Sequence, residues 1–177
     1  EQTFYVVAGT DAAPVRTKVI GKEHIYNCLE AAALAIAWDV DLVSIARGIE
    51  RVEYIPGRME QIECGQSFGV YLDRASAPHS LAAALEALRA VTHGLVYCVL
   101  CPPNDRDRGK RQLLAVAAEA GADVTVVTSG NLPESQTNEA LEDLRRGFTS
   151  KNSFHDEPNR KRAIEWALTQ ATIDDSV

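Results

Sequence analysis

The sequence predicts an α/β fold with a mostly parallel sheet, and three observations lead to this class. From about residue 78 onward, short apolar runs alternate with longer segments in which apolar residues recur at helical spacing. Strands that alternate with amphipathic helices favour right-handed βαβ connections and parallel pairing. The chain has 177 residues, of which 46% are hydrophobic, so it is long enough to bury a core.

The first part of the chain is predicted to form a hairpin and two helices. The expected elements are strands over Thr3–Ala8 and Arg16–Ile20, then helices over Glu23–Trp38 and from Asp41 to about Arg51. Gly9–Pro14 interrupts the two strands, because glycine and proline break regular structure. Asp41 is expected to cap the second helix, since its carboxylate can accept a hydrogen bond from the first turn. The break at Pro56 and Gly57 predicts two domains, residues 1–57 and 58–177.

The second part is predicted to contain two short strands, followed by alternating helices and strands. The expected strands cover residues 59–63, 68–72, 95–100 and 123–128, and the expected helices cover residues 78–91, 110–120, 139–147 and 158–171. A turn that contains Gly65 separates the two short strands. Pro158 suits the first turn of the last helix. Residues 148–157 are expected to form a loop.

The charge and hydropathy of the chain limit the classes of function. A formal net charge of -7 disfavours direct nucleic-acid binding, which needs a basic surface to displace counterions from phosphates. No apolar run reaches the roughly 20 residues that span a bilayer, so we expect a soluble protein that does not bind membranes.

The cysteines and histidines do not predict a metal centre or a catalytic residue. Cys98 and Cys101 lie in an apolar run, and on a strand their side chains would face opposite sides of the sheet. Buried thiols are therefore favoured over a disulfide or a metal site. The four histidines lack metal-ligand spacing, and His79 has no paired nucleophile.

Three polar loops follow the strands that end at residues 72, 100 and 128. In open α/β sheets, ligands bind beyond the carboxyl ends of the strands, so we expect these loops to share one edge. Their candidate binding residues are Asp73, Arg106, Arg108, Lys110, Arg111 and Asn131. Asp73 could bind a ribose or cap the next helix. The cationic loop could contact a phosphate at a helix start, or form a self-neutralising cluster in which Asp107 caps the helix.

Several segments, taken in order, resemble the Mur ligases, and in particular the UDP-N-acetylmuramoyl-tripeptide synthetase branch, which adds the third residue of the peptidoglycan stem. Residues 56–60, Pro-Gly-Arg-Met-Glu, are identical to the hinge of that branch. Residues 105–111, Asp-Arg-Asp-Arg-Gly-Lys-Arg, match one of its loops, and residues 21–27, 72–78 and 128–131 match three further landmarks. The likeness runs from about Thr17 to Leu168 with correct order and spacing.

The resemblance implies the fold and the cofactors of the chain. Residues 1–57 would be the last strands and helices of the central ATP-binding domain, and residues 58–177 the Rossmann-like C-terminal domain. The family uses ATP and Mg, with Asn27 near the adenine, Arg58 near the ribose or phosphates, and Asp73 at the ribose. Asn131 would lie where the incoming amino acid binds. Because the family has plant relatives, the expected location is either the cytoplasm or the chloroplast stroma.

Departures from the family's motifs predict a relative that has lost ligase activity. His24, Arg74 and Ser76 replace residues of two nucleotide-binding motifs, and the loop at Gly130 and Asn131 lacks the arginine that grips a carboxylate. No Walker loop, Gly-x-x-x-x-Gly-Lys-Ser/Thr, occurs in the chain. The predicted function is a scaffold or complex subunit. Two alternatives remain open: part of an active ATP-dependent amino-acid ligase whose Walker loop lies upstream, and a nucleotide-binding module.

The cationic loop is the predicted contact for a protein partner with an anionic surface. Arg106, Arg108, Lys110 and Arg111 form the densest cationic spot of an acidic chain. If these charges are exposed, replacing Arg106 and Arg108 by Ala should leave thermal stability nearly unchanged and weaken partner binding. Unfolding without loss of partners would instead indicate a buried ion-pair network at the helix start.

Overall fold

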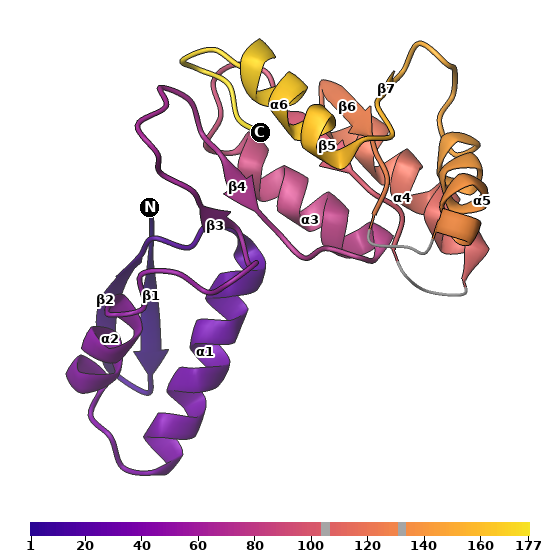
Figure 1. The fold of residues 1–177 in the computed structure, drawn as a ribbon. Helices are drawn as coiled ribbons and strands as arrows, with labels where there is room; N and C mark the ends of the chain where they lie inside the picture. Colours follow the sequence, from indigo (N-terminus) through magenta and orange to yellow (C-terminus); the bar gives the residue numbers. More distant parts are fainter. Residues whose placement is uncertain (104–106, 131–133) are drawn as a thin grey trace. The chain divides into compact units, whose positions relative to one another are not determined.

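The computed structural model describes residues 1–103, 107–130 and 134–177 (Figure 1). The chain divides into two compact units, Glu1–Gln61 and Ile62–Val177. The division falls slightly after the predicted boundary between residues 57 and 58. In the described part of the chain, none of the helices has the length and apolar character needed to cross a membrane.

The first unit begins with an antiparallel hairpin of β1 (Gln2–Ala8) and β2 (Asp11–Thr17). The two-residue turn places Gly9 at a φ of 61°, which suits glycine at the first position of a type II′ turn. The predicted interruption over residues 9–14 is wrong, because β2 starts at Asp11 and includes Pro14. Proline is tolerated there because Tyr5 and Pro14 are paired at an edge position that needs no ladder hydrogen bond.

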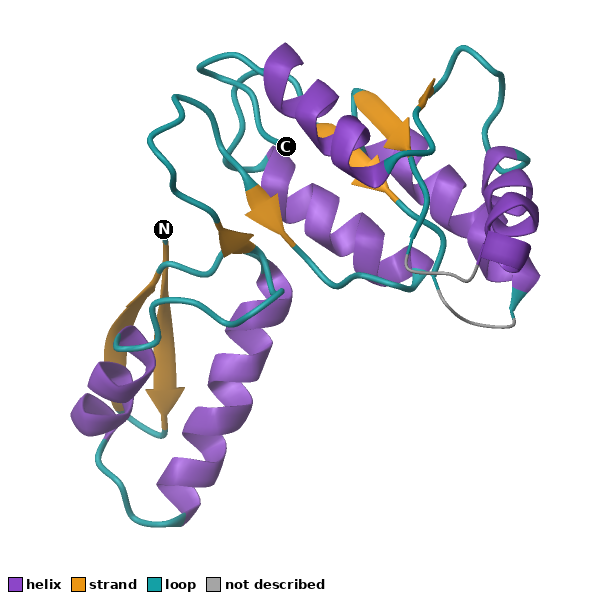
Figure 2. Cartoon of the chain, viewed as in Figure 1, coloured by secondary structure: helices purple, strands orange, loops and turns teal. Residues whose placement is uncertain are grey.

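Two helices cover one face of this hairpin (Figure 2). They are α1 (Lys22–Ala37) and α2 (Leu42–Glu50), and a short strand, β3 (Glu60–Gln61), ends the unit. The Oδ1 atom of Asp41 accepts a hydrogen bond from the Ser44 N–H at 2.9 Å, which confirms the predicted cap. The core between hairpin and helices contains the buried side chains of Val6, Ala13, Val15, Ala32, Ile45 and Ala46.

The second unit alternates helices and strands, as an α/β fold requires. Its elements are β4 (Tyr71–Leu72), α3 (Pro78–Arg89), β5 (Tyr97–Leu100), α4 (Arg108–Gly121), β6 (Val124–Val127), α5 (Glu134–Arg145), β7 (His155–Asp156) and α6 (Arg160–Gln170). Strands β5, β6 and β7 are hydrogen-bonded in this order and run parallel. The predicted fold class is therefore confirmed.

Two details of the region before α6 differ from the prediction. Part of the expected loop over residues 148–157 forms β7, which pairs with Val126 and Val127 of β6. Helix α6 begins after Asn159, whose Oδ1 atom accepts a hydrogen bond from the Arg162 N–H at 3.1 Å. Pro158 therefore lies outside the helix, and its carbonyl oxygen accepts a hydrogen bond from the Ser129 N–H at 3.2 Å.

The residues after α6 extend the parallel arrangement as a tail segment, residues 172–177. Ser176 forms parallel bridges with Gly69 on one side and with Val96 on the other. Main-chain N–H groups donate to main-chain carbonyls on both sides, at 2.8 to 3.0 Å. The donor and acceptor residues are Gly69 and Asp175, Val177 and Gly69, Tyr71 and Val177, Ser176 and Leu95, and Tyr97 and Ser176. The tail segment thus lies between residues 69–71 and the start of β5.

Asp175 fixes the tail segment through its side chain. One carboxylate oxygen accepts a hydrogen bond from the Leu95 N–H at 2.6 Å, and the other accepts from the Thr172 N–H at 2.7 Å and the Thr172 hydroxyl at 2.9 Å. These bonds favour the ionised carboxylate and lower the pKa of Asp175, the bond from Leu95 most of all. The buried Ser176 hydroxyl accepts a further hydrogen bond from Thr92 at 2.8 Å.

Substitution of Asp175 by Asn is expected to reduce the acid sensitivity of the second unit. A lowered folded-state pKa gives stability that is complete above the ordinary carboxyl pKa, about 4, and is lost as the pH falls through the folded value. Asp175→Asn removes the pH-dependent stability that the ionised carboxylate contributes. The variant should therefore be less stable at neutral pH and should lose less stability on acidification. Thermal unfolding between about pH 3 and pH 7 measures both effects.

The matched control is Asp174→Asn, because Asp174 is the exposed neighbour of Asp175. Its melting profile should follow that of the unaltered chain. An equal flattening of the profile in both variants would show that net charge, and not the bonds of Asp175, controls the acid response.

Candidate functional site

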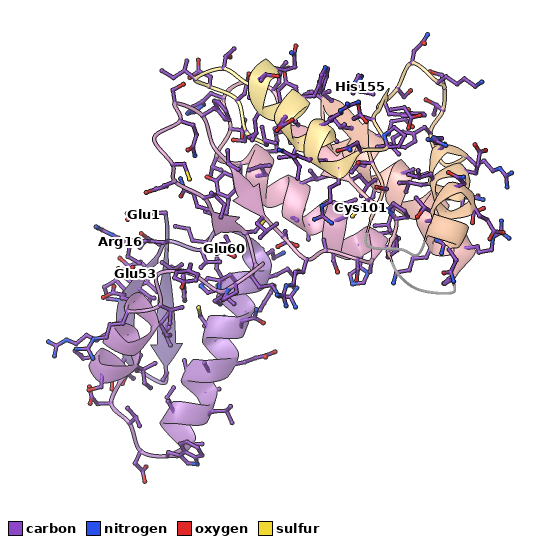
Figure 3. All side chains as sticks on the ribbon, in the orientation of Figure 1. Glu1, Arg16, Glu53, Glu60, Cys101 and His155 are labelled. Atoms are coloured by element: carbon purple, nitrogen blue, oxygen red, sulfur yellow. The ribbon has the colours of Figure 1, made fainter. Side chains whose placement is uncertain are left out.

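The loops after β5, β6 and β7 meet at one edge of the sheet, which includes two of the three loops expected there, those after residues 100 and 128. The Thr128 N–H donates to the Leu100 carbonyl at 2.9 Å. The Thr128 hydroxyl and the Ser129 N–H both donate to the Pro158 carbonyl, at 3.4 and 3.2 Å. Figure 3 labels Cys101 and His155, which belong to the segments around β5 and β7. This edge is the candidate site.

Close packing at Gly130 shapes this edge. A Cβ atom added to Gly130 would lie 3.0 Å from the Pro102 carbonyl oxygen and 3.8 Å from the Sγ atom of Cys101. The loop after β5 would have to move by a few tenths of an ångström to accept a side chain. The backbone at this edge is therefore adapted to glycine, at the position where the resembling family carries an aspartate.

A buried carboxylate, Asp143 of α5, binds two of the predicted cations. The Nε and NH2 atoms of Arg108 donate to its two oxygens at 2.9 and 2.8 Å, and Arg111 NH1 donates to Oδ2 at 3.1 Å. Asp143 is 1% exposed and Arg111 is 7% exposed. The hydrogen bond from Arg108 is the largest of the effects that lower the pKa of Asp143. Arg108 also contacts Glu139 at 2.5 Å.

The prediction of exposed cations is wrong for Arg111, which is buried in this network. Arg108 is exposed, and its guanidinium is bound by Asp143 and Glu139. Helical spacing places Arg108 and Arg111 one turn apart on the face of α4 that packs against α5. Lys110 is half-buried, and Arg106 lies outside the described residues.

The start of α4 agrees with the interpretation of the cationic loop in which Asp107 caps the helix. The Oδ1 atom of Asp107 accepts a hydrogen bond from the Lys110 N–H at 3.2 Å and caps the helix. Together with the Asp143 network, this cap fixes the first turn of α4 against α5. Among the described residues of this cluster, Asp143 and Glu139 pair with Arg108, and Asp143 also pairs with Arg111.

The predicted nucleotide-binding residues are divided between the two units. Asn27 is exposed on α1, and Arg58 is exposed in the turn before β3. Asp73 belongs to the second unit, where its Oδ1 atom accepts a hydrogen bond from the Ala75 N–H at 2.7 Å. The alternative that Asp73 caps the next helix is wrong, since α3 starts after Ala77 without a side-chain cap. Asn131 lies outside the described residues.

The segment around Arg58 is a tight turn. Gly57 and Met59 have φ values of 68° and 43°, in the left-handed region, and the Gly57 N–H donates to Glu60 Oε2 at 2.8 Å. Two left-handed residues within three positions bend the chain sharply. The turn holds Arg58 at its exposed side.

His24 belongs to a buried polar cluster that sequence reasoning did not identify. Its Nε2 atom lies 3.0 Å from the Thr17 hydroxyl and 3.3 Å from the Sγ atom of Cys28. Burial lowers the pKa of His24 and favours its neutral form. The spacing of His24, Cys28 and Ala32 by four residues could have indicated the buried face of α1.

The cysteines are free thiols, and burial raises the pKa of Cys98 to about 12. Thiolates and not thiols act as nucleophiles and metal ligands, so Cys98 is chemically inert in the fold. Among the residues that the structure describes, no cluster of three His, Cys, Asp or Glu side chains could hold a metal ion.

Comparisons with known proteins identify one family. Residues 57–177 match the family described as Mur ligase, glutamate ligase domain. The UDP-N-acetylmuramoyl-L-alanyl-D-glutamate–2,6-diaminopimelate ligase of Geobacillus kaustophilus is 37% identical over 167 residues, which are 94% of this chain and 34% of the relative. A chloroplastic MurE homologue of Arabidopsis thaliana is 35% identical over 134 residues, 76% of this chain and 17% of the relative.

Solved structures show the same arrangement of elements. A structure of a UDP-N-acetylmuramoyl-L-alanyl-D-glutamate–2,6-diaminopimelate ligase superposes with a TM-score of 0.66 at 28% identity and covers 99% of this chain and 36% of that protein. The folylpolyglutamate synthase of Mycobacterium tuberculosis, at 18% identity, shares the fold with a TM-score of 0.74 over 98% of this chain and 43% of its own. The chain spans about a third of the length of the curated ligases that it matches over most of its length.

Proposed function

The chain belongs to the Mur ligase family, and we propose that these 177 residues have no ligase activity of their own and act as a scaffold or subunit of a protein complex. The observation that carries the proposal is the altered edge of the sheet. Gly130 packs against the Pro102 carbonyl at the position where the family has an aspartate.

The chemistry of the substituted loops supports this function. Recognition of an amino-acid carboxylate in the usual manner needs an arginine, because its planar guanidinium binds both oxygens at once. The loop after Gly130 has leucine and proline at the corresponding positions of the sequence. The loss of these groups from a fold that keeps its core favours a structural role over ligation.

ATP and Mg remain the cofactors that the family resemblance implies. Solved relatives include an Escherichia coli FolC in complex with ADP, at 19% identity. In the present chain, Asn27, Arg58 and Asp73 would contribute contacts to the base, the ribose and the phosphates. The residues that would hold the triphosphate in a Walker loop do not occur in this sequence.

We therefore expect the chain by itself to bind Mg-ATP weakly or not at all. The three side chains would contact only the periphery of the nucleotide. Most of the negative charge of the triphosphate would therefore not be neutralised by the protein. Isothermal titration calorimetry with Mg-ATP should give a dissociation constant in the millimolar range or no heat. A constant of micromolar or tighter, about -8 kcal/mol, would contradict the expectation and favour a nucleotide-binding module.

A second candidate function is the C-terminal part of an active ligase. Identity of 37% to a diaminopimelate ligase, together with coverage of only a third of that enzyme, favours it. The test is ADP release by the longest natural polypeptide that contains this chain, with UDP-N-acetylmuramoyl-L-alanyl-D-glutamate and 2,6-diaminopimelate as substrates. Release of ADP that depends on both substrates would overturn the non-catalytic proposal.

The same proposal includes a location in the cytoplasm or the chloroplast stroma. The chloroplastic relative from Arabidopsis supports the second compartment. Immunofluorescence of the natural protein in its own cells would distinguish the two.

A further inference from the structure

A side-chain contact joins the end of β2 to the start of α1. Strand β2 ends at Thr17, and α1 begins at Lys22 after Gly21, an N-cap residue that offers no side-chain hydrogen bond to the first turn. His24 belongs to that first turn, and its Nε2 atom lies 3.0 Å from the Thr17 hydroxyl. The contact therefore ties an uncapped helix start to the hairpin.

The hydrogen bonds around the His24 ring assign the nitrogen that carries the proton. The Thr17 Oγ1 atom accepts a hydrogen bond from the Val19 N–H at 3.3 Å, so the hydroxyl hydrogen is available to donate to His24 Nε2. The Cys28 thiol, a weak donor, lies 3.3 Å from the same nitrogen. Nε2 is therefore the acceptor of a neutral ring, and the ring proton belongs on Nδ1.

The hydrogen-bond partners of the ring carry no negative charge, among the residues of the first unit, all of which are described. Thr17, His24 and Cys28 are 2%, 8% and 5% exposed. Burial lowers the pKa of His24 and raises the pKa of the Cys28 thiol, which keeps both groups neutral. From β1, the neutral Gln2 amide donates to two main-chain carbonyls of the segment between β2 and α1, at 2.9 and 3.1 Å.

The charged side chains of the elements around this contact lie at the surface. Exposed are Glu1 before β1, Arg16 of β2, Lys18 after β2, Lys22 and Glu23 of α1, and Glu50 of α2. Burial, and not a charged neighbour, is the cause of the shift in the pKa of His24. A positive charge on His24 would also lie in the first turn of α1, where the helix dipole disfavours cations.

We propose that the contact between His24 and Thr17 is a pH-sensitive switch, in which protonation of the ring at weakly acidic pH releases the first turn of α1 from β2. The second proton converts Nε2 from an acceptor into a donor and places an uncompensated charge in a buried position. The opening is local, because the core between the hairpin and the helices consists of apolar side chains that do not titrate.

The pH range of the switch follows from the direction of the pKa shift. A histidine whose folded-state pKa is lowered contributes stability that is complete above the ordinary value, about 6.5, and is lost as the pH falls through the folded value. Between the two values, the equilibrium constant for opening rises about tenfold for each pH unit. The switch therefore acts below about pH 6.5, where carboxylates with ordinary or lowered pKa values remain ionised.

Nuclear magnetic resonance of the intact chain tests the switch. At about pH 7.5, where the ring is neutral, its nitrogen shifts should show a proton on Nδ1 and none on Nε2 of His24. Protection of the Val19 and Cys28 amides from hydrogen exchange, corrected for the intrinsic rate at each pH, should fall about tenfold per pH unit below about pH 6.5. The amides of β5 and β6 should keep their protection. Protection that stays constant down to about pH 5 overturns the proposal, and so does an equal loss along α1 and α2, which would mean that the whole first unit unfolds.

Two variants distinguish the switch from a contact that only stabilises the fold. His24→Asn removes the titrating group, so the protection of Val19 and Cys28 should no longer depend on pH in this range. The matched control is His79→Asn, which removes an exposed histidine of the second unit and should respond like the intact chain.

The second variant, Thr17→Val, decides the question if His24→Asn does not fold. It removes the hydroxyl that stabilises the neutral ring, so the ring should titrate at a higher pH than in the intact chain, and the pH-dependent loss of protection should be smaller. A pH response that persists in His24→Asn contradicts the proposal. A His24 ring that titrates in Thr17→Val at the same pH as in the intact chain, or at a lower one, contradicts it as well.

Discussion

Replacing Asp143 by Ala is expected to destabilise the second unit by about 3–5 kcal/mol, because Arg111 would remain buried without its carboxylate. Removing one partner of a buried charge pair costs more than the net value of the pair itself. The same substitution removes the two hydrogen bonds that Arg108 donates to the carboxylate oxygens of Asp143. Helix α4 would then lose its main polar link to α5.

Urea unfolding followed by tryptophan fluorescence measures this effect. Trp166 belongs to α6 of the second unit and stacks on His155, with ring centroids 4.0 Å apart. Trp38 is 81% exposed in the first unit, so a Trp38→Phe background leaves Trp166 as the reporter. Glu139→Ala is the control, since Glu139 is exposed and contacts Arg108 alone among the ion pairs described. Equal midpoints for the two variants would show that the buried pair does not stabilise the fold.

Replacing Ser176 by Pro is expected to cost about 3 kcal/mol or more and to unfold the second unit at moderate temperature. Proline removes the N–H that donates to the Leu95 carbonyl at 2.9 Å, in a segment that is bonded on both sides. It also removes the hydroxyl that accepts from Thr92. Interior strands do not tolerate proline, because no water can replace the lost donor.

Two variants distinguish the contribution of the Ser176 N–H from that of the Ser176 hydroxyl. Ser176→Ala removes only the hydroxyl and should cost about 1 kcal/mol. Circular dichroism during heating compares both variants with the intact chain. Similar melting temperatures for Ser176→Pro and the intact chain would mean that the tail segment can leave the sheet without unfolding it.

Most helices of this fold could be predicted closely from the sequence, although α5 starts at residue 134 and not at the expected residue 139. The shortest strands could not be predicted. Apolar residues at every third or fourth position mark the face of α3 that buries Leu81, Leu85 and Leu88, and this pattern is local. Strand β7 has two polar residues, His155 and Asp156, and is defined by its pairing with β6. No local pattern reveals such a strand.

The sequence predicted that the loops after residues 100 and 128 lie at one edge, but it did not predict that Arg111 is buried. Parallel strands fix where their following loops meet, so the edge at Leu100, Thr128 and Pro158 follows from topology alone. The partner of Arg108 and Arg111 is 32 or more positions away, in a helix segment whose charged residues suggest a solvent-facing surface. Only tertiary packing shows that Asp143 points inward.

The position of the tail segment controls when the second unit can fold. Its contacts join residues that are 80 and 84 positions apart, Leu95 with Asp175 and Thr92 with Ser176. Contacts of such long range close large loops and slow folding. During synthesis, residues 69–71 and the start of β5 emerge long before their common neighbour exists. The second unit therefore completes its fold only after residue 176 has left the ribosome, and until then the place between residues 69–71 and β5 stays unfilled.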